Sequence, residues 1–351
     1  MRFKTVELPY HVYIGEGEIS KLGKVLESLE VSYFLLLTDS VVKNLVVVNL
    51  RNELAEWDYD MVIVETAKME EARKIMLQSG FSDYDAVIGI GGGKVLDVSK
   101  VVSTEMNATL ISIPTTASHD GIASPVASFK ENGKPISIST NPPSAVIADL
   151  SIIRNCPIRL LRSGYGDLIS NISSVRDWQL ARDLVGENYN EVAASIAVMP
   201  AQLMVSKADE LDLTLPPHLL MLMRGLIMSG VAIALVGSSR PASGAEHKFS
   251  HAIDYLGYGN GTHGEQVAIG TIIMEYLHER HYGKGNWELI KNSLEKVNAP
   301  TTAKEIGLTK EQVLEALMLA KKLRKKRFTI LEAINPTKEE FELILSKTGI
   351  A

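Results

Sequence analysis

The sequence predicts an α/β fold in two parts: a parallel-sheet domain over residues 1–156, followed by an all-helical domain over residues 157–351. Two features lead to this prediction. Up to about residue 150, short apolar runs alternate with helical patterns, which is typical of parallel βαβ units. After Ile158 the strand patterns stop, and apolar residues recur only at helical spacing. The length of 351 residues suits two domains of ordinary size.

The first part begins with short strands within residues 1–20. Further strands are expected where a short apolar run stands between turn residues, and helices where apolar residues recur every three or four positions. The predicted strands cover residues 33–37, 61–64, 86–90, 110–113 and 145–148. The predicted helices cover residues 19–29, 41–56, 69–79 and 95–102. A polar turn at 130–134, between residues 127–129 and 136–138, predicts a β-hairpin.

The second part is predicted to contain only helices. They cover residues 167–183, 190–207, 217–238, 246–256, 263–281 and 287–297, with two more after Lys310. The longest uncharged apolar stretch, 225–239, is shorter than the ~20 residues that a membrane span needs. We therefore interpret it as a buried core helix.

Three consecutive glycines, Gly91, Gly92 and Gly93, connect the strand at 86–90 to the next helix. Glycine lets a ligand approach the backbone closely, and the free N–H groups at a helix start attract an anion. A pyrophosphate is the natural ligand, although a tight strand-to-helix turn needs the same glycines. The pattern is neither G-x-G-x-x-G nor a P-loop, because Lys94 is not followed by Ser or Thr.

Asp39 follows the strand at 33–37, so it is expected at the carboxyl edge of the sheet, where ligands of open α/β sheets bind. Its carboxylate can accept hydrogen bonds from ribose hydroxyls, or it can cap the next helix. Both roles can hold together. A carboxylate repels a 2′-phosphate and so favours NAD, whereas Lys43, one turn later, can offset this. We therefore expect both NAD and NADP to serve.

Three of the eight histidines cluster in the second part: His247, His251 and His263. His247 and His251 share one helix face, and a capping box formed by Thr262 and Glu265 places His263 in the first turn of the next helix. Spacing alone predicts a metal bound by all three, although an ordinary helix pair with polar histidines is the alternative. Asp167, at the end of SGYGD, is expected at a glycine-rich helix start, where a terminal charge or cap is common.

Composition excludes several classes of function. The net charge of −6 gives no overall positive field to attract nucleic acid. The basic run at 321–327 is either a solvated helix end or a contact for a phosphate or a partner. Cys156 is the only cysteine, so no intramolecular disulfide can form, and a reducing compartment is expected. The first 30 residues do not resemble a signal peptide. We expect a soluble, cytoplasmic protein without a membrane span.

Four features together resemble one enzyme superfamily. They are GGGKVLD at 91–97, PTTASHDG at 114–121, GYGD at 164–167, and two histidines, His247 and His263, on either side of a glycine loop. The superfamily includes glycerol dehydrogenases, iron-type alcohol dehydrogenases and dehydroquinate synthases. The resemblance extends along nearly the whole chain. TTASHDGIASP and SGAEHKFSHAID are most similar to the archaeal-type sn-glycerol-1-phosphate dehydrogenases.

The resemblance implies a Rossmann-like nucleotide domain and roles for individual residues. Zn²⁺ would be held by Asp167, His247 and His263, while Asp120 and His251 would contact the substrate. His251 is then not a ligand, in contrast to the prediction from spacing. With Asp39 added from the sheet-edge argument, the cofactor-binding residues are Asp39, Gly92, Gly93, Lys94, Asp97, Thr115, Thr116, Ala117, Ser118 and Ser124.

The implied reaction is the reversible reduction of dihydroxyacetone phosphate to sn-glycerol 1-phosphate by NAD(P)H, a step in making glycerophospholipid backbones. Zinc would polarise the C2 carbonyl, and three protein ligands would leave one position open for substrate. Lys130, Lys134 and His251 are candidates to balance the substrate phosphate. We also expect a homo-oligomer.

Three alternatives remain open. The first is a glycerol or alcohol dehydrogenase without phosphate specificity. The second is a dehydroquinate-synthase-like lyase; those enzymes typically place a basic cluster around their metal ligands, whereas residues 244–264 offer only Lys248. The third is a metal-stabilised binding protein without turnover, against which the intact set of three candidate ligands argues.

Overall fold

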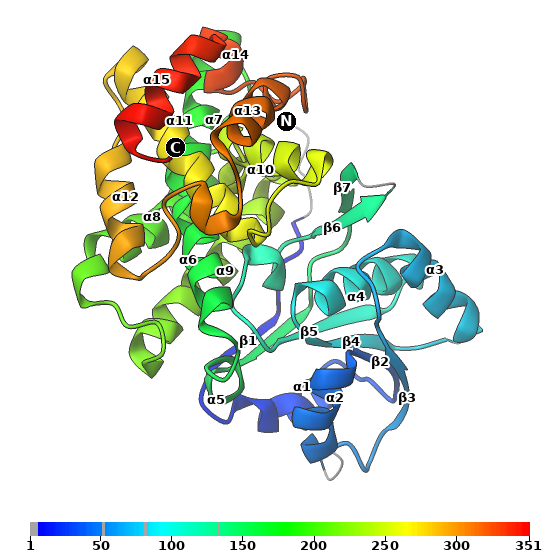
Figure 1. The fold of residues 1–351 in the computed structure, drawn as a ribbon. Coiled ribbons are helices and arrows are strands. Elements are labelled where there is room, and N and C mark those ends of the chain that lie inside the picture. Colours follow the sequence, from blue (N-terminus) through cyan, green and yellow to red (C-terminus); the bar gives the residue numbers. More distant parts are fainter. Residues whose placement is uncertain (1–5, 51–52, 81–82, 132–133) are drawn as a thin grey trace. The chain divides into compact units, whose positions relative to one another are not determined.

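The computed structural model describes residues 6–50, 53–80, 83–131 and 134–351. The chain forms two compact units, whose elements are labelled in Figure 1. Unit 1 comprises Met1–Ile158 and Thr214–Gly237, and unit 2 comprises Arg159–Leu213 and Ser238–Ala351. The first division lies next to the boundary expected between residues 156 and 157. The return of 214–237 to unit 1 was not predicted, because a helical pattern does not indicate which core the helix joins.

Unit 1 is built on a six-stranded sheet in which every pairing is parallel, with strand order β1-β8-β5-β4-β2-β3. Its strands are β1 (His11–Gly15), β2 (Tyr33–Thr38), β3 (Asp58–Ile63), β4 (Ala86–Gly91), β5 (Thr109–Pro114) and β8 (Ala145–Asp149). The predicted hairpin forms as the antiparallel pair β6 (Val126–Glu131) and β7 (Lys134–Ser139). The alternation of strands and helices in the sequence therefore predicted the parallel sheet correctly.

Helices cover both faces of this sheet (Figure 1). They are α1 (Leu22–Ser28), α2 (Ser40–Leu45), α3 (Met69–Gln78), α4 (Gly93–Glu105) and α5 (Leu150–Ile153). Unit 1 also contains the longer helix α9 (Pro216–Val236). Leu36 of β2 packs into the core with α1 and α2, whereas its neighbour Leu35 packs into the opposite core with α3 and α4. This alternation follows from strand geometry. The helix expected over 41–56 is shorter, because α2 ends at Leu45 and a 3-10 turn, Val47–Leu50, follows.

The apolar helix α9 packs in unit 1. It has 21 residues and a mean hydropathy of 2.2, so by length and composition it is the one helix in the described part of the chain that could cross a membrane. The argument that the apolar stretch at 225–239 is too short to span a membrane is therefore wrong, because the helix that contains it is longer. However, 56% of its most apolar window is buried. A Cβ on Gly230 would lie 2.7 Å from the Ser124 nitrogen, so α9 approaches the loop after β5 at backbone distance. Such contacts are typical of a core helix.

Unit 2 is helical throughout its described residues, as predicted. Its helices are α6 (Ile158–Ile169), α7 (Asn171–Val185), α8 (Glu191–Ser206), α10 (Ala245–Leu256), α11 (His263–Tyr282), α12 (Trp287–Lys296), α13 (Lys310–Ala320), α14 (Ile330–Ile334) and α15 (Lys338–Thr348). The helix expected over 167–183 is instead two helices, so Asp167 lies in the last turn of α6 and not at a helix start. The basic run follows α13, which ends at Ala320.

Candidate nucleotide and metal sites

The glycine turn joins β4 to α4 as the sequence predicted. Gly91 ends the strand, Gly92 occupies the N-cap position without a side-chain cap, and Gly93 begins the helix. The N–H groups of the first helical turn are therefore not satisfied by a capping side chain, and the helix dipole adds partial positive charge there. This end of α4 has the properties of an anion site.

The glycines of this turn serve different purposes. A Cβ on Gly93 would lie 2.2 Å from Nε2 of His119, whose ring is held because its Nδ1 accepts a hydrogen bond from Gly121 N at 2.9 Å. Gly93 is therefore needed to make room for His119, a residue that sequence reasoning did not single out. A Cβ on Gly92 would meet nothing closer than Oγ1 of Thr116 at 3.6 Å. The surrounding protein therefore leaves enough room for a side-chain methyl group at Gly92.

A Gly92→Ala variant tests whether a ligand approaches this backbone. Its φ of −82° and ψ of −172° suit alanine, so the fold should be retained. We expect the dissociation constant for NADH to rise about tenfold, or 1.4 kcal/mol, because the methyl group occupies the approach path. Calorimetric titration with NADH and a thermal melt measure both quantities. An unchanged affinity would show that the glycine serves the turn alone.

Asp39 lies next to the glycine turn at the carboxyl edge of the sheet, because β2 and β4 are neighbours. The helices that follow these two strands cover opposite faces, so the edge between them is a topological switch point. Oδ1 of Asp39 accepts hydrogen bonds from the N–H groups of Val41 and Val42, both at 2.9 Å. The capping role is therefore present. Both capping hydrogen bonds go to Oδ1, so Oδ2 of Asp39 can still accept a hydrogen bond from a ribose hydroxyl.

The loop after β5 returns to the same sheet edge. Thr115 N donates to Gly91 O at 3.0 Å, and the Thr116 and Ser118 hydroxyls lie 3.3 Å apart. Thr115 and Ala117 are buried, as is Ser124, whose hydroxyl donates to Val126 O at 3.4 Å. Thr115 and Thr116 therefore lie beside the glycine turn, since Thr116 Oγ1 would also be 3.6 Å from a Cβ on Gly92.

Asp120, the predicted substrate contact, lies on this loop. Its Oδ2 accepts a hydrogen bond at 2.8 Å from the hydroxyl of Ser229 on α9, which sequence reasoning missed. The side chains of Lys130 and Lys134, proposed to balance phosphate, lie outside the described part of the structure.

Two other predicted cofactor residues contact the protein itself. The buried Asp97 forms a 3.0 Å ion pair with Lys100, whose Nζ also donates to Val126 O at 2.7 Å. Ser128 N donates to the other Asp97 oxygen at 3.3 Å. The Asp97 carboxylate therefore links α4 to β6 through an ion pair and a hydrogen bond. Its direct contact with the cofactor phosphates stays a prediction. Lys94 Nζ lies 3.4 Å from Glu65 O, beside the turn.

In unit 2, Asp167, His247 and His263 come together. One ligand atom from each lies within 4.8 Å of the others. Oδ1 of Asp167 is 3.7 Å from Nε2 of His247 and 3.5 Å from Nε2 of His263. One carboxylate oxygen and two imidazole nitrogens at this spacing form a donor set suited to a divalent transition metal.

Neighbouring groups orient both imidazoles. Nδ1 of His247 lies 2.9 Å from Oε1 of Glu246, and that oxygen also accepts a hydrogen bond from Gly244 N at 2.5 Å. The imidazole is therefore the donor in this pair, which leaves its Nε2 with a lone pair. Nδ1 of His263 lies 3.3 Å from the Ser250 hydroxyl, which itself donates to Oε1 of Gln266 at 2.7 Å. Ser250 must then accept from His263. Both rings therefore direct an unprotonated Nε2 toward Asp167, as metal-binding histidines require.

Buried charge further shapes the site. Burial, followed by electrostatic interactions with His263, His251, Arg324 and Arg327, holds the pKa of His247 well below its ordinary 6.5. A neutral imidazole is the form that binds metal. Burial and the nearby Asp177 charge raise the pKa of the Glu246 carboxyl.

Asp177 anchors the start of α10. Its Oδ2 accepts from Ala245 N at 2.7 Å, and its Oδ1 accepts from Ile330 N at 2.8 Å. His278 Nε2 lies 2.9 Å from the same Oδ1. Sequence reasoning missed Asp177, Glu246 and Ser250. The only available signal was that Glu246 and Ser250 lie inside SGAEHKFSHAID.

Two glycines allow Asp167 to reach the histidines. A Cβ on Gly264 would lie 1.9 Å from the backbone oxygen of Ser163, and a Cβ on Gly166 would lie 2.5 Å from that of Gly264. The helices α6 and α11 therefore cross at backbone contact. Asp167 follows Gly166 directly, and His263 precedes Gly264, so the crossing sets the two ligands side by side. This explains Gly166 of SGYGD, a motif that the sequence suggested for a helix start.

His251 lies outside the group that could hold a metal, so the geometry does not support the three-histidine set predicted from spacing. Burial, followed by electrostatic interactions with Arg324, His263 and Arg327, lowers the pKa of His251 to about 3. The imidazole is therefore neutral at physiological pH, and it can hydrogen-bond without carrying charge.

Comparison with known proteins gives consistent results. Residues 13–157 match the family model "Iron-containing alcohol dehydrogenase". The chain is 84% identical, over the whole of both chains, to "Glycerol-1-phosphate dehydrogenase [NAD(P)+]" of Archaeoglobus fulgidus. It is 42% identical to the enzyme of that name from Methanosphaera stadtmanae, covering 100% of this chain and 99% of the relative. A probable glycerol dehydrogenase from Sinorhizobium meliloti has the same fold, with a TM-score of 0.80 at 21% identity over 99% of this chain and 98% of that one.

Proposed function

This chain belongs to the glycerol-1-phosphate dehydrogenase family, and we propose that it catalyses the reversible NAD(P)-dependent reduction of dihydroxyacetone phosphate to sn-glycerol 1-phosphate. The observation that carries the proposal is the full-length identity of 84% to a relative of that name. The grouping of Asp167, His247 and His263 supports it, since these are the ligands that the resemblance implies. The product is a backbone for glycerophospholipids.

We propose that Asp167, His247 and His263 hold Zn²⁺. The donor set has one oxygen and two nitrogens, which is suited to a catalytic zinc site with a position open for substrate. A zinc ion bound there supplies a Lewis acid for the C2 carbonyl. Glu246 and Ser250 fix the tautomers of the two histidines, and Gly166 and Gly264 fix the position of Asp167.

The nucleotide is assigned to the carboxyl edge of the sheet in unit 1. NAD(P)H supplies the hydride and leaves as NAD(P)⁺. The first turn of α4 would bind the pyrophosphate, Asp39 the ribose, and the loop over residues 115–118 with Ser124 the remainder of the cofactor. The hydrogen bond from Ser229 holds the Asp120 carboxylate in a defined position on that loop.

The neutral state of His251 restricts its role. Without a positive charge, it can orient the substrate through a hydrogen bond, but it holds no imidazolium proton to donate in the free protein. We therefore assign His251 to substrate positioning.

The direct test is the absorbance change at 340 nm with dihydroxyacetone phosphate and either NADH or NADPH. We expect steady oxidation with both, and a selectivity below a thousandfold in kcat/KM, because Lys43 can offset the repulsion from Asp39. A lyase that uses NAD transiently, or a binding protein, would give no sustained change. Equal activity with dihydroxyacetone would favour a glycerol dehydrogenase without phosphate specificity.

We also propose a cytoplasmic location. The single cysteine, Cys156, supports it, because such a chain forms no intramolecular disulfide and suits a reducing compartment. A homo-oligomer stays a prediction, which light scattering on the purified protein would test.

A further inference from the structure

Unit 2 contains a cavity of about 410 Å³ that is rich in positive charge. It is lined by Glu187, Ser238, Arg240, Arg324, Lys325, Lys326 and Arg327, here called the arginine cavity. Five of the seven lining residues are cations, and one is a carboxylate. Three separate segments of the chain supply them. Its volume falls in the range of small-molecule binding sites.

The lining of this cavity carries more positive than negative charge. Arg240 is only 4% exposed and pairs with Glu187, with Nε 2.6 Å from Oε1. Its Nη2 also donates to Phe328 O at 2.7 Å. Its Nη1, however, is buried and has no hydrogen-bond partner among the described residues. A buried donor without an acceptor costs about 1–3 kcal/mol, so a ligand oxygen is the expected partner.

Arg327 is affected by the other cations of the cavity. Burial, with the charges of Arg324 and Arg240, lowers its pKa to about 9, although Glu246 and Glu187 act in the opposite direction. Guanidinium groups this close repel each other unless an anion lies between them. An incoming anion would therefore be bound more strongly here than at an exposed surface.

Two arginines of the arginine cavity form hydrogen bonds to the residue just before α10, the helix that carries His247 and His251. Nη1 of Arg324 lies 3.2 Å from the Ser243 hydroxyl, and Nη1 of Arg327 donates to the Ser243 carbonyl. Ser243 lies just before α10, which carries His247 and His251.

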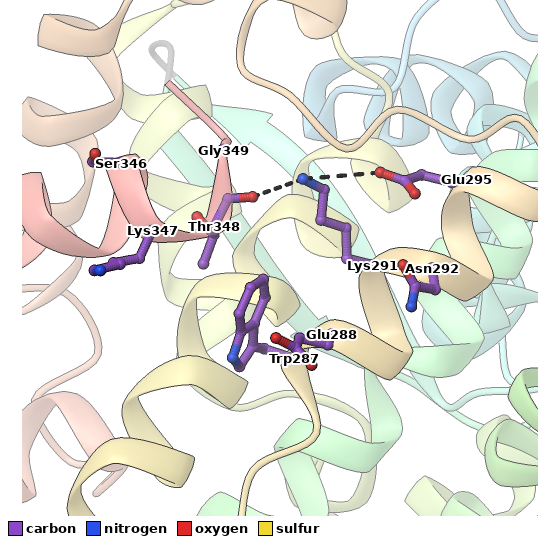
Figure 2. Close-up of a pocket in the computed structure, with 9 residues that line it drawn as sticks. All are labelled: Trp287, Glu288, Lys291, Asn292, Glu295, Ser346, Lys347, Thr348 and Gly349. Carbon is purple, nitrogen blue, oxygen red and sulfur yellow. Dashed lines mark hydrogen bonds and ion pairs between the residues drawn. The ribbon is translucent and has the colours of Figure 1, made fainter.

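A second cavity of unit 2, shown in Figure 2, provides a contrast. It has a similar volume of about 400 Å³ and lies between α12 and α15. Lys291 projects across it, donating to Thr348 O at 2.7 Å and lying 3.8 Å from Glu295 (Figure 2). Two lysines and two glutamates, Glu288 and Glu295, line this cavity. Charge is balanced there, so nothing favours an anion.

We propose that the arginine cavity binds the phosphate group of the substrate, with donors from Arg240 Nη1, Arg324 and Arg327. Guanidinium groups suit this role because their paired N–H donors match phosphate oxygens. The position near α10 would hold the phosphate of a three-carbon substrate while its carbonyl lies at the metal site. This inference rests on the proposed function and identifies the part of the site that distinguishes a phosphorylated substrate from glycerol.

The test compares Arg324→Gln with the unmodified full-length protein. We expect the KM for dihydroxyacetone phosphate to rise at least tenfold, or 1.4 kcal/mol. Activity with dihydroxyacetone should change less than twofold, because that substrate has no phosphate. Calorimetric titration with inorganic phosphate should show an affinity at least tenfold weaker. Arg280→Gln, which removes one half-exposed charge paired with Glu340 on the same unit, is the matched control and should behave as the unmodified protein.

Several outcomes would overturn the proposal. Unchanged phosphate affinity and KM would do so, as would an equal loss toward both substrates, which indicates a structural role. If Arg324→Gln fails to fold, a Lys325→Gln and Lys326→Gln double variant, whose side chains are exposed, should still weaken phosphate binding. If the unmodified protein does not reduce dihydroxyacetone phosphate, the proposed function fails, while the phosphate titration still tests the cavity without turnover.

Discussion

Asp167→Ala is expected to abolish stoichiometric metal binding and to lower kcat/KM about a thousandfold, or 4 kcal/mol. Asp167 supplies the only carboxylate of the three-residue group, and it lies between the two histidine nitrogens at 3.7 and 3.5 Å. Without it, two neutral imidazoles would have to hold a divalent ion with no compensating charge. Atomic absorption on the purified variant measures the metal content, and the 340 nm assay measures the activity.

His251→Ala is the matched control for this experiment. It also shortens a partly buried side chain in unit 2, but it lies outside the ligand group. One metal ion per chain should remain, while kcat/KM falls about tenfold through the loss of one hydrogen bond to substrate. Metal lost from His251→Ala but retained in Asp167→Ala would instead support the three-histidine set predicted from spacing.

Gly264→Ala is expected to damage the metal site without touching a ligand. The new Cβ would lie 1.9 Å from the Ser163 carbonyl oxygen, which is backbone and cannot rotate away. The helices α6 and α11 must then separate, at a cost of about 1–3 kcal/mol or more in the free energy of unfolding. Because Asp167 lies on α6 and His263 on α11, separating the two helices would move these ligands apart, and we expect metal affinity to fall together with thermal stability.

A substitution elsewhere on α11 distinguishes this effect from general weakening of the helix. Arg280→Ala replaces a side chain that is 46% exposed, and we expect its stability to change by no more than about 0.5 kcal/mol, with metal content unchanged. Thermal melting with and without added zinc measures both quantities. Equal melting temperatures for Gly264→Ala and Arg280→Ala would rule out the proposed close crossing.

The parts of the fold that depend on short-range patterns could be predicted from the sequence. The strand at 86–90, its glycines and the following helix form the predicted turn, because burial of β4 on both faces produces a continuous apolar run. His263 begins α11 as predicted, since Glu265 accepts from Thr262 N at 2.7 Å within one helical turn. The break between α6 and α7 was missed, because both sides of it have helical periodicity.

By itself, the sequence determined the order of the elements, the anion-binding turn, and the helix that presents His247 and His251. Each of these depends on residues within a few positions of one another, where spacing sets geometry. Only the tertiary structure decided that Asp167 joins His247 and His263, that α9 packs in unit 1, and that three distant segments line one basic cavity. The physical reason is that backbone packing at Gly264 joins residues 101 positions apart, and no local periodicity encodes such a contact.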